Sequence, residues 1–542
     1  MAELLQLLNR FLSEKGTVVN GNCFRPDGKY ENEQYFRIKK KLFAQFSSGW
    51  ITNRDKIIDV CLTKYKEHEL VLEENIASVH AESLIRFVLN QYGEYAKRNS
   101  DYHQFRFSAA EEKEWLAYAS HARRGMKYLL EYLCFHKENL TSAEGQDLSS
   151  KEGVAALSRI FISIEEMCAT YLRIDGYRFL MNDVQLKLDE KEWTYFHVPQ
   201  DLEPRNQLDV REERQEISRR INGKPYAHDI ECHSKLLEPK FSDHLGISYA
   251  QLIHFLKKYL ESQVHEVCVI PKEEVISDLQ EKFNISFDQA ANVIHGFSMR
   301  AINLVDRTLV NPKQEYRAYH RGFFEFQRDK VSMLYFSRTM ALENLDTLIN
   351  NTCYHKLPEE WKTSAIEIRL TALSNMAGKW FEEVLSTNLV SVGIKAISSV
   401  SLYRSQGKRI RPPEDVGEID FIGYSAEHCA LFVIEAKNVR FSTEPRLFRD
   451  DLSKFIDGKK SYAEKFISKC QWVVENLAVV KDEMKQQSIQ ILDIKKIYKV
   501  MVILAPSPVE DRISQFSCVN LVKFMRIVES GDLAPFHSVD MP

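Results

Sequence analysis

One stretch, Leu431-Phe-Val-Ile-Glu-Ala-Lys-Asn438, is an apolar run that closes on a carboxylate and an ammonium two residues apart. A continuous apolar run of this length predicts a buried strand. Side chains alternate between the two faces of a strand, so we expect Glu435 and Lys437 to share a face while Ala436 points into the opposite layer. Two opposite charges at the end of a buried strand indicate a functional site.

The preceding apolar segment, Gly417-Glu-Ile-Asp-Phe-Ile422, predicts a second strand that carries an acid. If the two strands pair as a hairpin across 425–428, Asp420 comes close to Glu435. Two carboxylates at one point repel each other unless a cation joins them. Hard oxygen ligands with positions left for water and phosphate suit Mg²⁺, or Mn²⁺ in its place. Lys437 beside such a cation could position water or stabilise developing charge.

A helix and further strands frame this hairpin. The pattern from Trp361 to Val392 predicts a long helix that ends at Gly393, with an apolar face suited to packing on a sheet. Glu382 lies beside that face and needs a partner, for which a metal ion or a lysine would serve. We expect a first strand at 394–403, helices at 447–477 and a buried strand at 498–504.

These residues together carry a resemblance. A helical Gly378-Lys-Trp-Phe-Glu382, then an Asp, then Glu-x-Lys at the end of an apolar strand resembles the PD-(D/E)XK, or restriction-endonuclease-like, superfamily. The Gly-x-x-Phe-Glu helix is similar to that of Mrr-type and nuclease-related members. The resemblance covers the last third of the chain, and one departure is visible, because Ile419 stands where the family name has proline.

The resemblance implies roles for four residues. By position, Asp420 and Glu435 would be the metal ligands, Lys437 the catalytic lysine, and Glu382 the helix acid that completes the site and its ligand set. It also implies an αβββαβ fold for residues 346–542 and a cleavage of phosphodiester bonds that depends on Mg²⁺ or Mn²⁺.

A basic segment separates the first two expected strands. From Arg404 to Arg411 the chain reads as a flexible loop, and its cationic members are Arg404, Lys408, Arg409 and Arg411. Cationic side chains near an acidic site suit contact with phosphates. A solvated loop with no binding role fits the same residues, and the sequence leaves both interpretations open.

Composition limits the classes of protein. The chain has 542 residues and a net charge of −4, so any contact with nucleic acid has to come from local patches. Its ten cysteines include no Cys-x-x-Cys pair, which argues against a zinc ribbon and suits the reducing cytoplasm. We expect no signal peptide and no membrane partner, since no apolar run is long enough to cross a bilayer. No phosphate-binding Gly-x-x-x-x-Gly-Lys loop is present, so a nucleotide-driven step would need a partner protein.

The first two thirds of the chain match no motif. Residues 1–190 predict a helical bundle, and 191–345 predict a mixed helical region with a β-hairpin at 321–337. Three short helices within 248–298 suit either a plain helical module or a winged-helix-like reader of duplex DNA. Basic residues between 317 and 330 make the likeliest cationic neighbourhood outside the last domain. The segment 228–233 reads as a loop with ordinary His and Cys residues.

The sequence therefore predicts an α+β multidomain protein in which a helical amino-terminal region senses or positions a substrate. The carboxy-terminal domain would be a metal-dependent nuclease, expected to be an endonuclease, with DNA as the favoured substrate and RNA as the alternative; the residues themselves leave DNA or RNA and endo or exo cleavage open. Cutting both strands with one site per chain predicts a homodimer. The architecture suggests prokaryotic antiviral defence or mobile-element biology by association only. The alternative is a nuclease fold that has lost catalysis and serves as a nucleic-acid-binding or protein-interaction scaffold.

Overall fold

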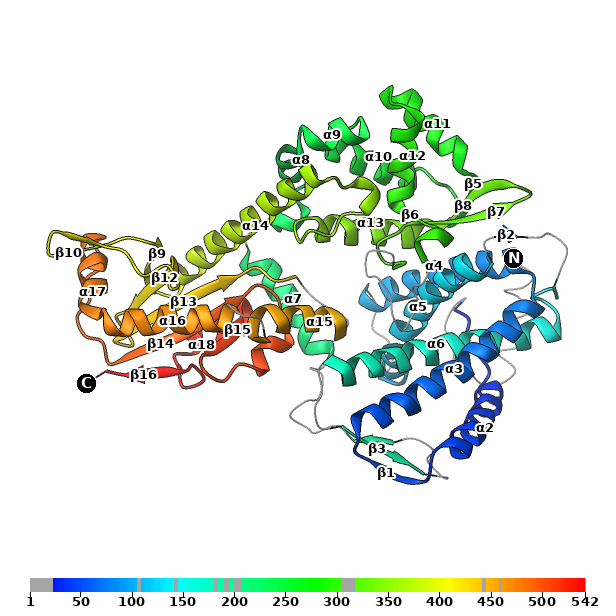
Figure 1. Ribbon diagram of the computed structural model, residues 1–542, viewed down its shortest axis with the longest axis horizontal. Helices are drawn as coiled ribbons and strands as arrows, with labels where there is room; N and C mark the ends of the chain where they lie inside the picture. Colours follow the sequence, from blue (N-terminus) through cyan, green and yellow to red (C-terminus); the bar gives the residue numbers. More distant parts are fainter. Residues whose placement is uncertain are drawn as a thin grey trace. The chain divides into compact units, whose positions relative to one another are not determined.

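The structure is a computed structural model that forms two compact units (Figure 1). Unit 1 comprises Met1–Leu202 with Ile230–Leu370, and unit 2 comprises Glu203–Asp229 with Thr371–Pro542. The expected divisions at 190/191 and 345/346 do not coincide with this partition. The residues that the structure describes are 23–104, 109–137, 139–140, 145–179, 184–189, 195–197, 207–221, 223–304, 317–440, 445–457 and 461–541.

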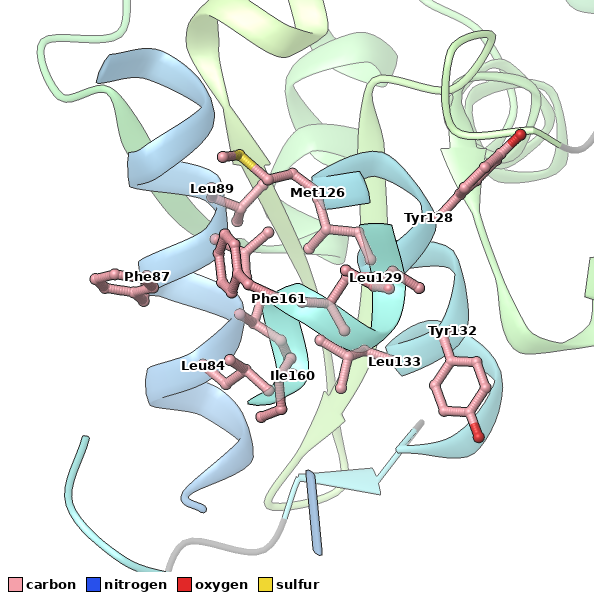
Figure 2. Packing of buried hydrophobic residues seen from close by; sticks show 14 of the residues in the cluster. Leu84, Phe87, Leu89, Met126, Tyr128, Leu129, Tyr132, Leu133, Ile160 and Phe161 are labelled. Carbon is pink, nitrogen blue, oxygen red and sulfur yellow. The ribbon is translucent and has the colours of Figure 1, made fainter. Parts of the chain in front are cut away.

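Helices form most of the first part of unit 1, as the sequence predicts. They are α2 (Gly28–Gln45), α3 (Arg54–Ser78), α4 (Ala81–Gln104), α5 (Ala109–His136) and α6 (Lys151–Phe179). Figure 2 shows Leu89 of α4, Leu129 of α5 and Phe161 of α6 in one apolar cluster, and all three are almost fully buried. Burial of such stripes, rather than helix propensity alone, holds helices of this length together.

Beside the bundle, unit 1 contains two small sheets. The first consists of β1 (Gly49–Ile51), β3 (Gln185–Leu188) and β4 (Tyr195–His197). The second consists of β2 (Asn139–Leu140), β5 (Val267–Pro271), β6 (Ser298–Met299), β7 (Phe323–Arg328) and β8 (Val331–Ser337). The β7–β8 hairpin confirms the prediction for 321–337. It turns at Asp329 and Lys330, whose φ values of 51° and 66° suit a tight two-residue turn.

Short helices accompany this second sheet. They are α8 (Ile230–Leu237), α9 (Lys240–Leu245), α10 (Tyr249–Glu261), α11 (Lys272–Phe283), α12 (Phe287–Phe297) and α13 (Arg338–Thr352). The three helices expected within 248–298 are confirmed, but they do not form a plain helical module. β5 separates α10 from α11 and pairs with β8, so the helices and the β7–β8 hairpin belong to one α/β substructure within unit 1. The prediction of a loop at 228–233 is wrong, because α8 begins at Ile230.

Unit 2 is built on a mixed six-stranded sheet (Figure 1). Its strands are β9 (Lys395–Val400), β12 (Ile419–Ser425), β13 (Ala430–Lys437), β14 (Lys496–Ile503), β15 (Ser517–Asn520) and β16 (Ser538–Asp540). The order across the sheet is β15-β14-β13-β12-β9, and β16 pairs with β14. β12 runs antiparallel to β9 and β13, whereas β13, β14 and β15 are parallel.

Helices lie on both faces of this sheet. They are α7 (Gln207–Arg220), α14 (Ser364–Ser391), α15 (Pro445–Leu452), α16 (Tyr462–Glu475), α17 (Leu477–Gln486) and α18 (Leu521–Ser530), with a π-helical turn at Ser453–Asp457. Phe432, Ile434 and Ala436 of β13 belong to the apolar cluster that α14 and α18 cover. The opposite face of β13 and β14 contacts α16. Glu435 and Lys437 thus share the face opposite Ala436, as expected, and this is the face that α16 contacts.

Helix α14 ends where the sequence predicts and begins slightly later. Trp361 lies in a separate 3₁₀ helix, Glu359–Trp361, and α14 starts at Ser364. At the other end Gly393 takes a φ of 74°, and the Ile394 N–H donates to the Leu389 carbonyl at 3.0 Å. This is a glycine C-cap that satisfies the last helix carbonyls. The division between the two units falls inside α14.

The segment after β9 differs from the prediction. The expected strand 394–403 is too long, because β9 ends at Val400. The prediction of a flexible loop at 404–411 is also wrong. Its residues form a separate hairpin of β10 (Tyr403–Ser405) and β11 (Lys408–Ile410). Gln406 and Gly407 form the turn with φ values of 50° and 75°, the two-residue geometry that suits a β-hairpin.

Candidate active site

The β12–β13 hairpin brings together the two acids predicted from the sequence. The strands pair in the register Phe421 opposite Ile434, which places Asp420 opposite Glu435. Asp420 Oδ2 accepts a hydrogen bond of 2.9 Å from the Ala436 N–H, so the carboxylate is fixed against the neighbouring strand. Glu435 is 5% exposed. The structure therefore confirms the predicted approach of these two carboxylates.

Lys437 lies within 4 Å of both carboxylates. Its Nζ is 2.7 Å from Glu435 Oε1 and 3.6 Å from Asp420 Oδ2, and it lies 5.4 Å from the centre of the Tyr462 ring. Burial by itself lowers the pKa of Lys437. The two carboxylates outweigh that effect and raise the pKa above its ordinary value. Lys437 is therefore a stable cation at this site.

A second lysine, which the sequence analysis did not place in the site, completes the cluster. Lys469 on α16 is 7% exposed, and its Nζ donates to Glu435 Oε1 at 2.8 Å and to Oε2 at 2.6 Å. The same ammonium is 3.7 Å from Asp420 Oδ1. One sequence signal could have revealed it. Lys469 falls within the apolar stripe of Phe466, Cys470 and Val473, where a lysine is rarely found without a buried partner.

Glu382 approaches the cluster from α14. Asn438 Nδ2 donates to the Ala377 carbonyl at 2.9 Å, which holds the end of β13 against this helix. Burial raises the pKa of Glu382, and the negative charge of Asp420 raises it further, although Lys437 opposes both effects. Among the residues that the structure describes, none makes a hydrogen bond or ion pair with the Glu382 carboxylate. All four predicted side chains therefore meet in one electrostatic neighbourhood.

The carboxylate oxygens of Asp420 and Glu435 are of the type that binds a small, hard divalent cation. The ammonium groups of Lys437 and Lys469 each contact Glu435 and lie within 4 Å of Asp420, so the two carboxylates already share positive charge. Oxygen donors of this kind are those that Mg²⁺ and Mn²⁺ prefer. Within the described ranges, no group of three or more His, Cys, Asp and Glu side chains is arranged to hold a metal ion. Glu382 as a third ligand stays a prediction.

The basic hairpin β10–β11 is fixed by contacts with α16 and α17 of the same unit. The Arg404 N–H donates to Glu483 Oε2 at 2.7 Å, and the Arg404 carbonyl accepts from Gln486 Nε2 at 2.9 Å, so β10 lies against α17. The Tyr403 ring contacts Trp472 of α16 with centroids 4.7 Å apart. The four cationic residues predicted to contact phosphates, Arg404, Lys408, Arg409 and Arg411, are all exposed.

Among the basic residues between 317 and 330, Lys330 is exposed, but others do not fit contact with nucleic acid. Arg317 and Arg321, in the expected basic neighbourhood of unit 1, are almost fully buried and pair with Glu131 and Glu360 respectively. The aromatic residues of the β7–β8 hairpin belong to the core. The exposed residues of α11 are mostly acidic, which disfavours contact with a phosphate backbone. These acidic residues are Glu273, Glu274, Asp278 and Glu281.

No described helix has the length and apolar character needed to cross a membrane. Comparisons with family models, curated proteins and solved structures find no match to this chain.

Proposed function

We propose that unit 2 is a nuclease that hydrolyses phosphodiester bonds with the help of a divalent cation. The observation that supports this proposal is the convergence of Asp420, Glu435 and Lys437 from one hairpin with Glu382 from α14. Two acids and a lysine of one hairpin, with a third acid from α14, form a cluster of charges at the end of a buried strand. Their combination suits the binding of a cation and the activation of water.

Each side chain has a role that its position supports. Asp420 and Glu435 would hold the cation, because the hairpin fixes both carboxylates at one point. The cation would supply Lewis acidity toward the phosphate and lower the pKa of a water molecule. Lys437 has a side chain that is 23% exposed, so it can orient water or stabilise charge that develops on the phosphate. Glu382, with its raised pKa, can complete the ligand set or hold a proton.

Two wider features support the same proposal. The order α14, β9, β12, β13, α16, β14 is the helix, three strands, helix and strand that the resemblance implies. The exposed cations of the β10–β11 hairpin offer a local attraction for a polyanion on a chain with a net charge of −4. The resemblance favours DNA over RNA as the substrate and endonucleolytic cleavage.

A second candidate is a binding module that has the nuclease fold and lacks catalysis. One observation favours it: the charges of both hairpin carboxylates are already balanced by Lys437 and Lys469. A site satisfied in this way needs no metal ion for its stability. This candidate predicts nucleic-acid binding without cleavage.

A cleavage assay separates the two candidates. The full chain is incubated with plasmid, linear duplex, single-stranded DNA and RNA, each with and without Mg²⁺ or Mn²⁺. The nuclease proposal predicts cleavage of at least one substrate, dependent on the metal and abolished in Asp420→Asn. Lys465→Ala, an exposed lysine on α16, serves as a matched control. Binding without cleavage of any substrate, in either metal, would identify the non-catalytic module.

A further inference from the structure

Lys469 has a different environment from Lys437, although both contact Glu435. The Lys469 side chain is 9% exposed, against 23% for Lys437. Lys469 comes from α16, on the sheet face opposite α14, and its ammonium contacts the Asp420–Glu435 pair. Lys469 is therefore more enclosed than Lys437, and its partners among the residues that the structure describes are Glu435 and Asp420.

The ammonium of Lys469, like that of Lys437, contacts Glu435 and lies within 4 Å of Asp420, where a cation shared by the two carboxylates would bind. Its Nζ bonds to both oxygens of Glu435 and lies 3.7 Å from Asp420 Oδ1. The other Asp420 oxygen accepts the Ala436 N–H. A divalent cation bridging the same carboxylates would lie within a few ångströms of a buried positive charge. Like charges at such a distance repel strongly where water is excluded.

We propose that Lys469 is the built-in counter-ion of the Asp420–Glu435 pair, and that a divalent cation binds only by displacing its ammonium. This inference rests on the proposed function, since it concerns the same carboxylates. Lys469 acts as a positioning residue. In the metal-free protein it holds the hairpin acids together and limits divalent binding to concentrations that overcome the competition. The four-carbon stem of lysine allows the ammonium to move aside while α16 stays in place.

The test measures metal binding directly. Mg²⁺ and Mn²⁺ are titrated calorimetrically into the full-length wild type, Lys469→Met, Lys469→Arg and the control Lys465→Met. Removal of the competing charge should tighten divalent binding about tenfold or more in Lys469→Met. Lys469→Arg, which keeps the charge, should bind no more tightly than wild type, and Lys465→Met should match it. Equal or weaker affinity in Lys469→Met would overturn the inference and leave the nuclease proposal standing.

The folding of Lys469→Met is measured in parallel by circular dichroism. If Lys469→Met is unfolded without metal, the proposal predicts that millimolar Mg²⁺ or Mn²⁺ restores its circular dichroism, because the cation replaces the missing ammonium. A variant that stays unfolded in both metals would contradict the proposal. Absence of binding by both wild type and folded Lys469→Met would overturn the inference together with the metal-dependent chemistry. Binding by Lys469→Met alone would support the inference even if wild type shows no detectable affinity.

Discussion

The ammonium of Lys469 lies 2.6 Å from Glu435 Oε2, although the two residues are 34 positions apart and belong to a helix and a strand. Both side chains are less than 10% exposed. A charge pair this enclosed contributes little net stability relative to apolar residues, but removal of one partner leaves the other buried and uncompensated. The pair therefore links the stability of unit 2 to the chemistry of its site.

The first prediction concerns stability. Lys469→Ala should lower the free energy of unfolding by about 3 kcal/mol or more, because Glu435 then keeps a buried charge with only Lys437 to balance it. The double variant Glu435→Gln, Lys469→Met removes both charges and should recover most of that decrease. Urea denaturation of the full chain, in the presence of a chelator, measures both. A Lys469→Ala protein as stable as the exposed-site control Lys465→Ala would show that the pair is energetically unimportant.

Catalysis gives a second prediction. Asp420→Asn should slow cleavage by a factor of about 100 or more, since the amide lacks the charge that holds a cation. Its oxygen can still accept the hydrogen bond from the Ala436 N–H, so the fold should be intact. Lys437→Met should reduce activity to a similar extent. Cleavage rates of variants with unchanged circular dichroism test this, and a wild-type rate in either would remove that residue from the mechanism.

The basic hairpin gives a third prediction. Replacing Lys408, Arg409 and Arg411 with alanine should weaken nucleic-acid binding, and the log–log salt dependence should flatten by about one unit for each phosphate that is no longer neutralised. Sequence preference should change little, because interactions with phosphates carry no sequence information. Affinity is measured across salt concentrations with metal omitted.

A matched control for the hairpin variant lies in unit 1. Alanine at the exposed Lys235, Lys257 and Lys258 removes the same net charge and should leave the salt slope unchanged. If hairpin variant and control behave alike, the effect is one of overall charge, and the hairpin is not the binding surface.

The fourth prediction is a dependence of stability on pH in unit 1. His68 is 3% exposed, and in the described part of the structure neither ring nitrogen has a hydrogen-bond partner. Burial lowers its pKa to about 3 from an ordinary value of 6.5. The unfolded chain therefore binds the extra proton first as pH falls. Stability is fully present above pH 6.5 and decreases below it, by about 2 kcal/mol at pH 5 for this group.

His68→Leu tests this dependence, because it removes the titrating group and keeps an apolar side chain in the bundle. Urea midpoints between pH 7.5 and 5 should slope less steeply for the variant than for wild type. His295, whose pKa burial lowers to about 4, titrates over part of the same range, so some slope should persist. Parallel slopes for wild type and His68→Leu would contradict the prediction.

The parts of the site that depend on strand geometry could be predicted from the sequence. Alternation fixes the shared face of Glu435 and Lys437, and the short connection implies a hairpin that brings Asp420 near Glu435. The turn itself lies one residue later than the expected 425–428, because Ser425 pairs with Ala430, and this register places Asp420 opposite Glu435. Lys469 could not be placed in this way. Its approach depends on how α16 crosses the sheet, and that is decided by the packing of apolar side chains from several distant segments.

The contrast between local strand geometry and long-range packing also explains why the sequence did not predict the β10–β11 hairpin or the place of the segment 207–221. The β10–β11 hairpin is short and polar, so no apolar alternation reveals it, and its position comes from contacts with α17. The segment 207–221 joins unit 2 through ion pairs that are distant in sequence, such as Arg220 with Glu529 and Glu216 with Arg526. Composition gives no indication of such long-range partners, so a division of the chain by composition misses them.

The hairpin register also has a consequence for the order in which unit 2 folds. Asp420 and Glu435 are separated by a short connection and can meet as soon as β12 and β13 pair, on the microsecond timescale of hairpin formation. Lys469 arrives only when α16 docks, and β14 must then add alongside β13 from a distant part of the chain. Before α16 docks, the two acids therefore share only the charge of Lys437, which belongs to the same hairpin, and the remaining negative charge weakens the pairing of β12 with β13. Divalent cations and salt should for this reason accelerate the folding of unit 2.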